Sequence, residues 1–264
     1  MHPVLFRIGT FEVGTYGVIL ALGFLAALAL AKRQAKLDGL PGEAVSDLAM
    51  TVLFAGLVGS RVLYILVELL KGAPAREVFS LGMLRAAGHI HGGILAALAA
   101  FLWRSKKLGL RFGVTGDALV PATALGQALG RLGCFSAGCC YGTVCDKPWA
   151  VTFTSADAAR FSGTPLYEHL HPVQLYTFAG NLVVMGLLLA LRPKRRFEGQ
   201  VLAAYFVLEG IARAVVETWR GDLDRGTWFG LAWLSTGRLT ALAFVAIGVV
   251  IAVVMGRRAP AKAA

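Results

Sequence analysis

Two arginines lie within apolar stretches of this sequence, where a charged side chain is costly. Arg61 follows Gly59 and Ser60 in the middle of one stretch, and Arg131 stands near the end of another. A charge at the centre of a membrane span costs about 2.5–3.5 kcal/mol, so it faces a partner or a wet cavity. Because a guanidinium binds two phosphate or carboxylate oxygens at once, these arginines indicate either structural ion pairs or an anion site.

A third apolar stretch carries alternating charges. Glu209, Arg213 and Glu217 are spaced four residues apart, and Arg220 follows them. This spacing places the first three on one face of a helix. Charges on a membrane helix face the protein interior, so the stretch predicts an internal polar site, with a purely structural bridge as the alternative.

Another apolar segment begins with the consecutive residues His91, Gly92 and Gly93. The glycines leave the backbone open to an approaching group, and a histidine there can act as a base, a proton carrier or a ligand. A histidine held by structural hydrogen bonds is the alternative. His89, His91 and the cysteines match no standard zinc spacing, and we expect no metal.

Four cysteines follow Arg131 closely: Cys134, Cys139, Cys140 and Cys145. Four cysteines allow three pairings, and the sequence does not choose among them. A bond between the adjacent Cys139 and Cys140 would be strained. We expect the cysteines to be disulfide candidates that brace a loop; a thiol redox or metal site is the alternative.

The composition is that of an integral membrane protein. The 264 residues are 57% hydrophobic and only 16% charged, against about 25% charged in soluble domains. The net charge of +11 comes from short clusters between apolar runs, which argues against nucleic acid as a partner. We predict an all-α polytopic membrane protein with seven spans at 14–31, 47–70, 89–103, 115–133, 172–191, 199–219 and 236–255.

The basic clusters follow the first, third and fifth spans and occur again in the C-terminal tail. By the positive-inside rule, the N-terminus lies outside and the C-terminus in the cytoplasm. The prediction is one membrane domain, 1–264, with an extracytoplasmic cysteine-containing loop at 134–170. The four cysteines then face an oxidising compartment.

The predicted direction of each span places several polar residues at a similar depth in the membrane. The outer ends or halves of five spans carry Tyr16, His91, Arg131, His171 with Gln174, and Arg213 with Glu217. This arrangement predicts one cation-lined cavity in the outer leaflet. Such a cavity suits an anionic lipid headgroup whose acyl chains remain in the membrane.

Taken together, these motifs resemble the prolipoprotein diacylglyceryl transferase family along nearly the whole chain. The matching motifs are TYG at 15–17, GSR at 59–61, HGGI at 91–94, GRLG at 130–133, Gly138, Gly142, HPVQLY at 171–176, and the series Arg213, Glu217 and Arg220. The resemblance implies transfer of the diacylglyceryl group of phosphatidylglycerol to the lipobox cysteine of a prolipoprotein signal peptide, with release of glycerol 1-phosphate. It also implies a multi-pass protein of the bacterial cytoplasmic (inner) membrane that needs no cofactor.

The resemblance also implies roles for single residues. His91 would take the proton of the thiol, with an arginine-centred activation as the rival. Arg131 and Arg213 would stabilise the phosphate and the departing glycerol phosphate. Glu217 would orient Arg213. The expected substrate-binding residues are Tyr16, Arg61, Arg131, Gly92, Gly93, Gly142, Gln174, Glu217 and Arg220.

One motif departs from the family pattern. Asparagine usually follows GRxG, whereas this chain has Cys134 there, and Ala137-Gly138-Cys139 stands where the family often has Asn-Gly-Glu. Either a disulfide holds the loop, or the lipid or acceptor differs. A transporter is a further alternative, opposed by the one-sided polar residues and the lack of an inverted repeat. A thiol redox protein is another, weakened by the lack of a CxxC motif.

Overall fold

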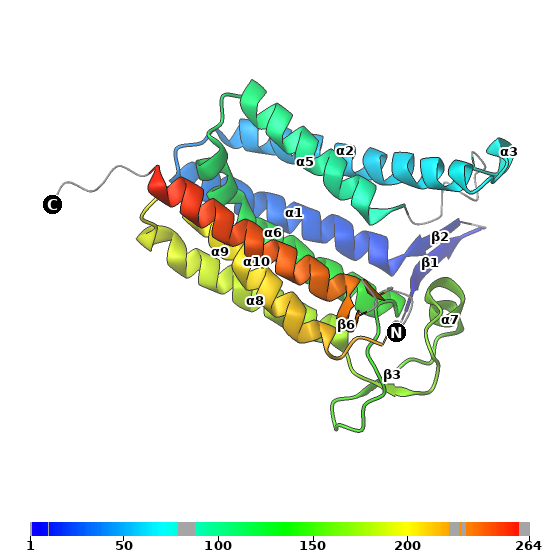
Figure 1. Cartoon of the computed structure of the whole chain (residues 1–264). Helices are drawn as coiled ribbons and strands as arrows, with labels where there is room; N and C mark the ends of the chain where they lie inside the picture. Colours follow the sequence, from blue (N-terminus) through cyan, green and yellow to red (C-terminus); the bar gives the residue numbers. More distant parts are fainter. Residues whose placement is uncertain (1, 10, 79–87, 222–226, 229–230, 259–264) are drawn as a thin grey trace. The chain divides into compact units, whose positions relative to one another are not determined.

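Helices make up most of the computed structural model, which describes residues 2–9, 11–78, 88–221, 227–228 and 231–258 (Figure 1). The helices of 18 to 29 residues in the described part are α1 (Thr15–Leu37), α2 (Gly42–Leu70), α5 (Ile90–Lys107), α6 (Phe112–Ala137), α8 (Val173–Leu191), α9 (Gln200–Glu217) and α10 (Thr236–Arg257). Each predicted apolar segment lies on one of these helices, which confirms the helical prediction.

Four of the helices in the described residues are long and apolar enough to cross a membrane: α1, α2, α8 with the adjoining turn η1 (Arg192–Lys194), and α10. The other three long helices carry more charge or polarity. Helix α5 ends in three basic residues, and α6 and α9 hold the acidic residues and arginines of the predicted site. Seven helices therefore match the predicted spans, and four of them have the composition of a span.

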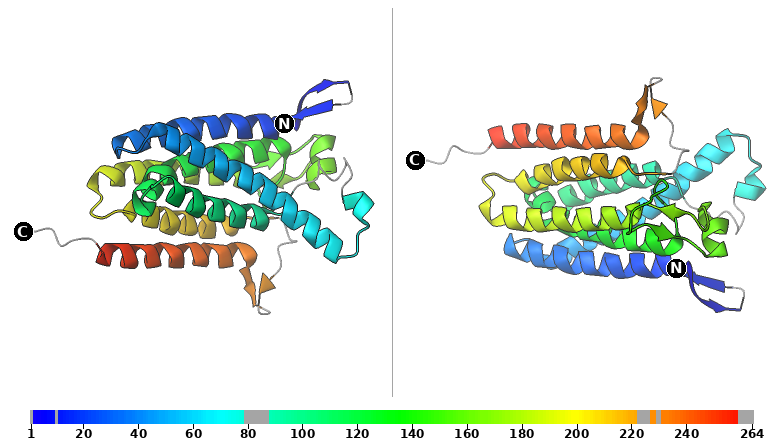
Figure 2. Two further views of the ribbon diagram at one scale, coloured as in Figure 1. Left: turned by 90° about the horizontal axis from the view of Figure 1, so that it is seen from above. Right: turned by 90° about the horizontal axis from the view of Figure 1, so that it is seen from below.

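The chain divides into two compact units. The first unit comprises 1–31 and 116–264, and the second comprises 32–115. In the first unit, α9 packs against both α8 and α10, and Figures 1 and 2 show the three helices side by side. Each unit is described below by itself.

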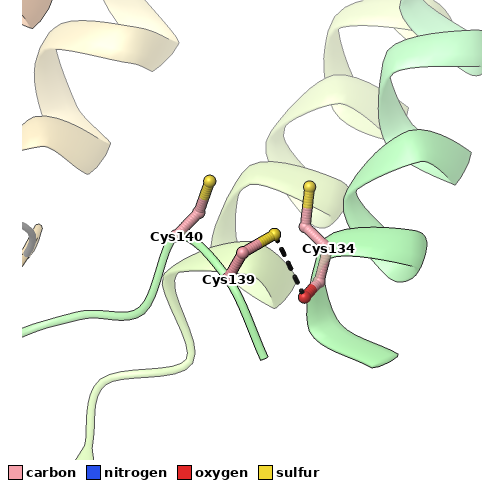
Figure 3. A group of neighbouring side chains, drawn as sticks. All are labelled: Cys134, Cys139 and Cys140. Atoms are coloured by element: carbon pink, nitrogen blue, oxygen red, sulfur yellow. Dashed lines mark hydrogen bonds between the residues drawn. The ribbon is translucent and has the colours of Figure 1, made fainter. Parts of the chain in front are cut away.

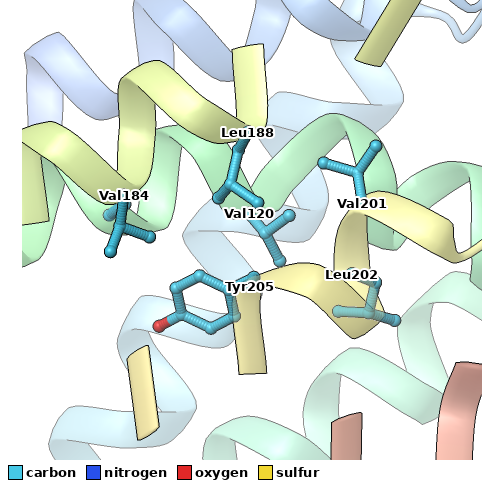
Figure 4. Packing of buried hydrophobic residues seen from close by; sticks show 7 residues of the cluster. Val120, Val184, Leu188, Val201, Leu202 and Tyr205 are labelled. Atoms are coloured by element: carbon cyan, nitrogen blue, oxygen red, sulfur yellow. The ribbon is translucent and has the colours of Figure 1, made fainter. Parts of the chain in front are cut away.

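An apolar cluster holds α6, α8 and α9 together in the first unit. Its buried members are Val120, Ala124, Val184, Leu188, Val201, Leu202 and Tyr205 (Figure 4). The Tyr205 hydroxyl donates to Gln127 Oε1 at 3.0 Å, so its polar end is also satisfied. This cluster fixes the arginine-bearing α6 against the charged helix α9.

Glycines allow α9 and α10 to approach closely. A Cβ on Gly210 would lie 2.7 Å from the carbonyl oxygen of Ala241, and one on Gly248 would lie 2.7 Å from that of Ala203. Small residues at helix contacts are typical of membrane helix pairs, where close van der Waals packing replaces the hydrophobic effect. The two contacts therefore set the spacing of this pair.

A similar contact joins α2 and α5 in the second unit. A Cβ on Gly59 would lie 2.6 Å from the carbonyl oxygen of Gly92, and Gly93 faces Gly56. The backbone N–H of His89 donates to the carbonyl oxygen of Ser60 at 3.0 Å. The GSR and HGG motifs therefore meet each other at a helix crossing.

Helix α6 is longer than predicted at its end. The sequence predicted that the loop begins at residue 134, but α6 continues through Ala137. Gly138 then adopts φ +82°, a left-handed conformation that ends helices and favours glycine. The first cysteine is thus helical, and the loop proper begins after it.

The remaining elements are short. The loop holds strands β3 (Val151–Thr152) and β4 (His169–Leu170), which pair antiparallel, and helix α7 (Ala156–Ser162) between them. Antiparallel pairs also form between β1 (Val4–Ile8) and β2 (Phe11–Gly14), and between β5 (Thr227–Trp228) and β6 (Leu231–Ser235). A single helical turn, α3 (Ala75–Val78), follows α2.

Asp117 of α6 caps the start of α9. Its carboxylate is fully buried and accepts hydrogen bonds from the backbone N–H groups of Gly199, at 2.9 Å, and Leu202, at 2.8 Å. Arg195 lies 3.7 Å from the same carboxylate. A carboxylate at this position satisfies otherwise unpaired N–H groups and complements the helix dipole.

We therefore expect Asp117→Ala to destabilise the protein. The change leaves two buried N–H groups without an acceptor, which costs about 1–3 kcal/mol each in buried sites. The measurement is thermal unfolding of the purified protein in detergent. Asp146→Ala, the same change at an exposed loop position, is the control and should be nearly neutral. Equal midpoints for the two variants would contradict the capping role.

Candidate functional site

The first unit contains a pocket between α6, α8 and α9 that is open on one side. Its lining is rich in charged and small side chains. The lining residues are Arg131, Thr177, Gly180, Asn181, Glu209, Ala212, Arg213, Val216, Glu217 and Arg220. Four residues that the sequence singled out separately, Arg131, Arg213, Glu217 and Arg220, therefore meet in one place.

Three arginines and two glutamates line the pocket, so its net formal charge is positive. Arg131 comes from α6, while Glu209, Arg213 and Glu217 come from one face of α9, as their spacing predicted. Arg213 Nη2 lies 4.0 Å from Glu217 Oε2. Each guanidinium carries N–H donors in a planar fork that matches phosphate and carboxylate oxygens, so three arginines suit the pocket to such an anion.

The carboxylate of Glu217 is held by the start of α10. Ser235 Oγ donates to Glu217 Oε1 at 2.8 Å and accepts from the backbone N–H of Arg238 at 3.2 Å. A Cβ on Gly237 would overlap the Glu217 carboxylate. The glycine therefore makes the space in which this carboxylate lies, beside a helix N-terminus that favours negative charge.

Sequence analysis missed part of the lining. Thr177 and Asn181 of α8 were not selected, and Glu209 was noted only for its spacing. Asn181 is buried, and the buried Oε2 of Glu209 has no hydrogen-bond partner among the described residues. Thr177 and Asn181 are four residues apart in an otherwise apolar helix, and that spacing could have indicated them.

Gln174 and His171 hold the loop that follows α6. Gln174 is fully buried, and its Nε2 donates to the carbonyl oxygen of Cys139 at 2.8 Å. His171 Nδ1 lies 3.0 Å from the Tyr176 hydroxyl, which accepts from Trp149 Nε1 at 2.8 Å. The structure thus gives Gln174 a role in loop positioning, and its contact with substrate stays a prediction.

Gly142 lies where three chain segments meet. Its N–H donates to the carbonyl oxygen of His171 at 3.1 Å, and it forms a bridge with Arg220. A Cβ there would lie 2.5 Å from the His171 carbonyl oxygen and 2.8 Å from that of Trp219. Only glycine fits this position, so the motif glycine has a packing reason as well as its predicted substrate role.

Tyr16 lies at the start of α1 and packs against α6. A Cβ on Gly133 would lie 2.9 Å from Tyr16 Cδ2. The tyrosine is exposed and is not among the residues that line the pocket. Its contact with a headgroup stays a prediction.

His91, Arg61, Gly92 and Gly93 belong to the second unit. His91 is exposed in the first turn of α5, and Arg61 is half-buried on α2. Gly92 and Gly93 form the helix contact with α2 described above. The predicted cavity combines residues of both units, and that combination stays a prediction.

Three of the four cysteines converge at the end of α6. The sulfur atoms of Cys134, Cys139 and Cys140 all lie within 4.8 Å of one another (Figure 3). The four thiols are free, and Cys139 Sγ lies 3.7 Å from the carbonyl oxygen of Cys134. Cys145 is buried elsewhere in the loop, where its N–H donates to the His169 carbonyl oxygen at 2.8 Å. The predicted disulfide stays a prediction.

The three thiols are electrostatically unequal. Hydrogen bonds from Cys134 and then Cys139 lower the pKa of Cys140 well below its usual range, and Arg220 adds charge and a hydrogen bond. The corresponding contacts with Cys134 and Cys140, together with burial, raise the pKa of Cys139. A lowered thiol pKa favours the thiolate, which is the form that binds metals and acts as a nucleophile.

Comparisons with known proteins give the same family as the sequence resemblance. The sequence profile of a family described as prolipoprotein diacylglyceryl transferase matches residues 3–254. Three relatives are called phosphatidylglycerol–prolipoprotein diacylglyceryl transferase. That of Clostridium tetani is 33% identical over 94% of this chain and 96% of its own length. The relative from Geobacter sulfurreducens is 32% identical over 98% of this chain and 96% of its own length. The relative from Vibrio atlanticus is 33% identical over 96% of this chain and 90% of its own length.

The match extends over nearly the full length of both this chain and its relatives. The chain belongs to the prolipoprotein diacylglyceryl transferase family.

Proposed function

We propose that this protein transfers the diacylglyceryl group of phosphatidylglycerol to the lipobox cysteine of a prolipoprotein signal peptide. Membership of the family and the names of its relatives supply the two substrates. The observation that carries the proposal is the pocket in which Arg131, Arg213 and Arg220 converge beside an apolar helix bundle. A lipid phosphate requires cations of this kind within reach of the membrane.

The proposed arrangement in the membrane has seven spans, with the N-terminus outside and the C-terminus in the cytoplasm. The basic residues support it, because they lie at the C-terminal ends of α1 and α5, directly after α8, and at the end of α10. On this topology the ends of α6 and α9 and the start of α8 lie outside, together with the pocket arginines and the cysteines. The protein then works as one domain at the outer face of the bacterial cytoplasmic membrane.

The proposed reaction exchanges a C–O bond for a C–S bond at one carbon. This is the carbon of the diacylglycerol part of the lipid that carries the phosphate. The acceptor thiol loses its proton, and the thiolate sulfur attacks this carbon to form a thioether. The bond between that carbon and the phosphate oxygen breaks, and its electron pair remains on the oxygen. Glycerol 1-phosphate leaves as an anion, so the negative charge that develops must be stabilised.

Each pocket residue has a role in this scheme. Arg131 and Arg213 bind the phosphate and stabilise the departing glycerol phosphate. Glu217 orients Arg213, and Arg220 adds positive charge at the same place. The exposed His91 takes the proton of the thiol. Tyr16, Arg61 and the motif glycines contact the lipid or the signal peptide.

Loss of a phosphate-binding arginine should abolish most activity. We expect Arg131→Ala and Arg213→Ala each to lower transfer at least about 100-fold, the cost of removing one donor from a developing anion. The measurement is lipidation of a lipobox peptide by membranes that contain phosphatidylglycerol. Arg257→Ala, an exposed arginine at the end of α10, is the control. Full activity in either pocket variant would contradict the role in phosphate binding.

A proton-accepting role for His91 predicts a pH-dependent defect. His91→Asn should be at least about 100-fold slower near pH 7, since general bases contribute about 10²–10⁴-fold. The defect should shrink as the pH approaches 9, because a free thiol with a pKa of about 8.5 then ionises without help. The control is His2→Asn at the exposed N-terminus. A defect that stays constant from pH 7 to 9 would favour the arginine-centred alternative.

The close contact between Gly237 and the Glu217 carboxylate allows a test of whether Glu217 orients Arg213. Gly237→Ala should displace the carboxylate and lower activity about 10–100-fold, since small misplacements of a binding group are costly. Its effect should be absent in a Glu217→Gln background, because both changes act on one interaction. Gly186→Ala is the control, because a Cβ there meets nothing within 4 Å. Additive losses would show that the glycine acts elsewhere.

A further inference from the structure

The proposed transfer uses none of the cysteines of this chain, yet three of them come together beside the pocket. Cys134 lies in the last turn of α6, and Cys139 and Cys140 follow the helix-ending Gly138. Their sulfur atoms lie within 4.8 Å of one another. Figure 3 shows the three side chains near the end of α6.

The spacing of the sulfurs is close to that of a metal site. An equilateral triangle with 4.8 Å sides has its centre about 2.8 Å from each corner, whereas a Zn–S bond measures about 2.3 Å. Because no separation in the group exceeds 4.8 Å, some point lies within about 2.8 Å of all three sulfurs, about 0.5 Å more than a Zn–S bond. A small rotation about χ1 within one rotamer well supplies a shift of this size without any change in the backbone.

The backbone holds the ligands in place before any ion binds. Cys140 adopts φ +60°, a left-handed conformation that is unfavourable for a residue with a side chain. The Cys139 carbonyl oxygen accepts from the buried Gln174, and the Tyr141 carbonyl oxygen accepts from the N–H of Gly221 at 3.2 Å. A strained residue that its surroundings hold in place is typical of functional sites.

Nearby arginines provide the compensating charge. Arg220 interacts with Cys140 through charge and a hydrogen bond, and Arg131 contributes positive charge at Cys134. Three thiolates around Zn²⁺ carry a net charge of about −1, and around Cu⁺ about −2. One or two guanidinium groups offset these charges in surroundings that are partly buried.

We propose that Cys134, Cys139 and Cys140 form a three-thiolate site for a thiophilic ion with a filled d shell, Zn²⁺ or Cu⁺. Thiolates select these ions over hard cations such as Mg²⁺. A disulfide is the competing use of the cysteines. It would join two sulfurs and leave the third unused, and the neighbouring pair Cys139 and Cys140 would be strained. An ion uses all three.

The proposed ion has a structural consequence for the pocket. It links the end of α6, which carries Arg131, to the loop that pairs with Arg220 at Gly142. The ion would thereby fix two pocket arginines relative to each other without contacting the substrate. This proposal departs from the sequence-based expectation of no metal, and it does not depend on the transferase activity.

The test is metal binding by the reduced, full-length protein in detergent under nitrogen. Zn²⁺ and Cu⁺ are titrated separately, and elemental analysis after gel filtration gives the stoichiometry. We expect one ion per chain, with at least tenfold weaker binding in Cys134→Ser, Cys139→Ser and Cys140→Ser. Cys145→Ser, which lies outside the three-sulfur group, is the matched control and should bind like the unaltered chain. Competition between the two ions identifies the preferred one.

A second measurement on the unaltered chain covers the case in which a serine variant fails to fold. Saturating metal should slow alkylation of Cys134, Cys139 and Cys140 at least tenfold, read residue by residue by mass spectrometry. Three results would overturn the proposal: no stoichiometric binding of either ion, unchanged alkylation rates, or a disulfide within the group in protein alkylated before its membranes are opened.

Discussion

The cost of a charged group in apolar surroundings is the constraint on which the first unit depends. Helix α9 carries Glu209, Arg213 and Glu217 on one face, and α6 carries Arg131. None of these groups can face lipid without a large loss of solvation, so the two helices must turn them toward a shared pocket. At the other end of the same helices, Asp117 binds the start of α9 for the same reason.

Close backbone contacts provide the precision that this pocket requires. Apolar side chains alone hold membrane helices together weakly, because lipid is equally apolar. Glycines at Gly210 and Gly248 therefore bring α9 against α10, and Gly237 leaves room for the Glu217 carboxylate. The same device joins Gly59 and Gly92 in the second unit. Several glycines of this sequence are thus explained by packing, whatever further contacts they make.

The loop after α6 extends this polar arrangement beyond the helices. Gln174, buried at the start of α8, binds the Cys139 carbonyl oxygen, and Gly142 lies against both His171 and Trp219. The loop is therefore attached to the ends of α6, α8 and α9, which are also the helices that line the pocket. A brace at the three cysteines would act directly on the geometry of the arginines.

The sequence by itself determined the seven long helices of the described residues and the shared face of Arg213 and Glu217, because hydrophobic length and four-residue spacing are local properties of a chain. It also indicated the family, through motifs kept in order. Only the tertiary structure decided which groups meet: Ser235 and Gly237 at Glu217, Gln174 at the loop, Asn181 in the pocket, and three thiols in one place. Spacing assigns a residue to a face of its helix, but its partner comes from another helix, and the packing of side chains between the helices selects that partner.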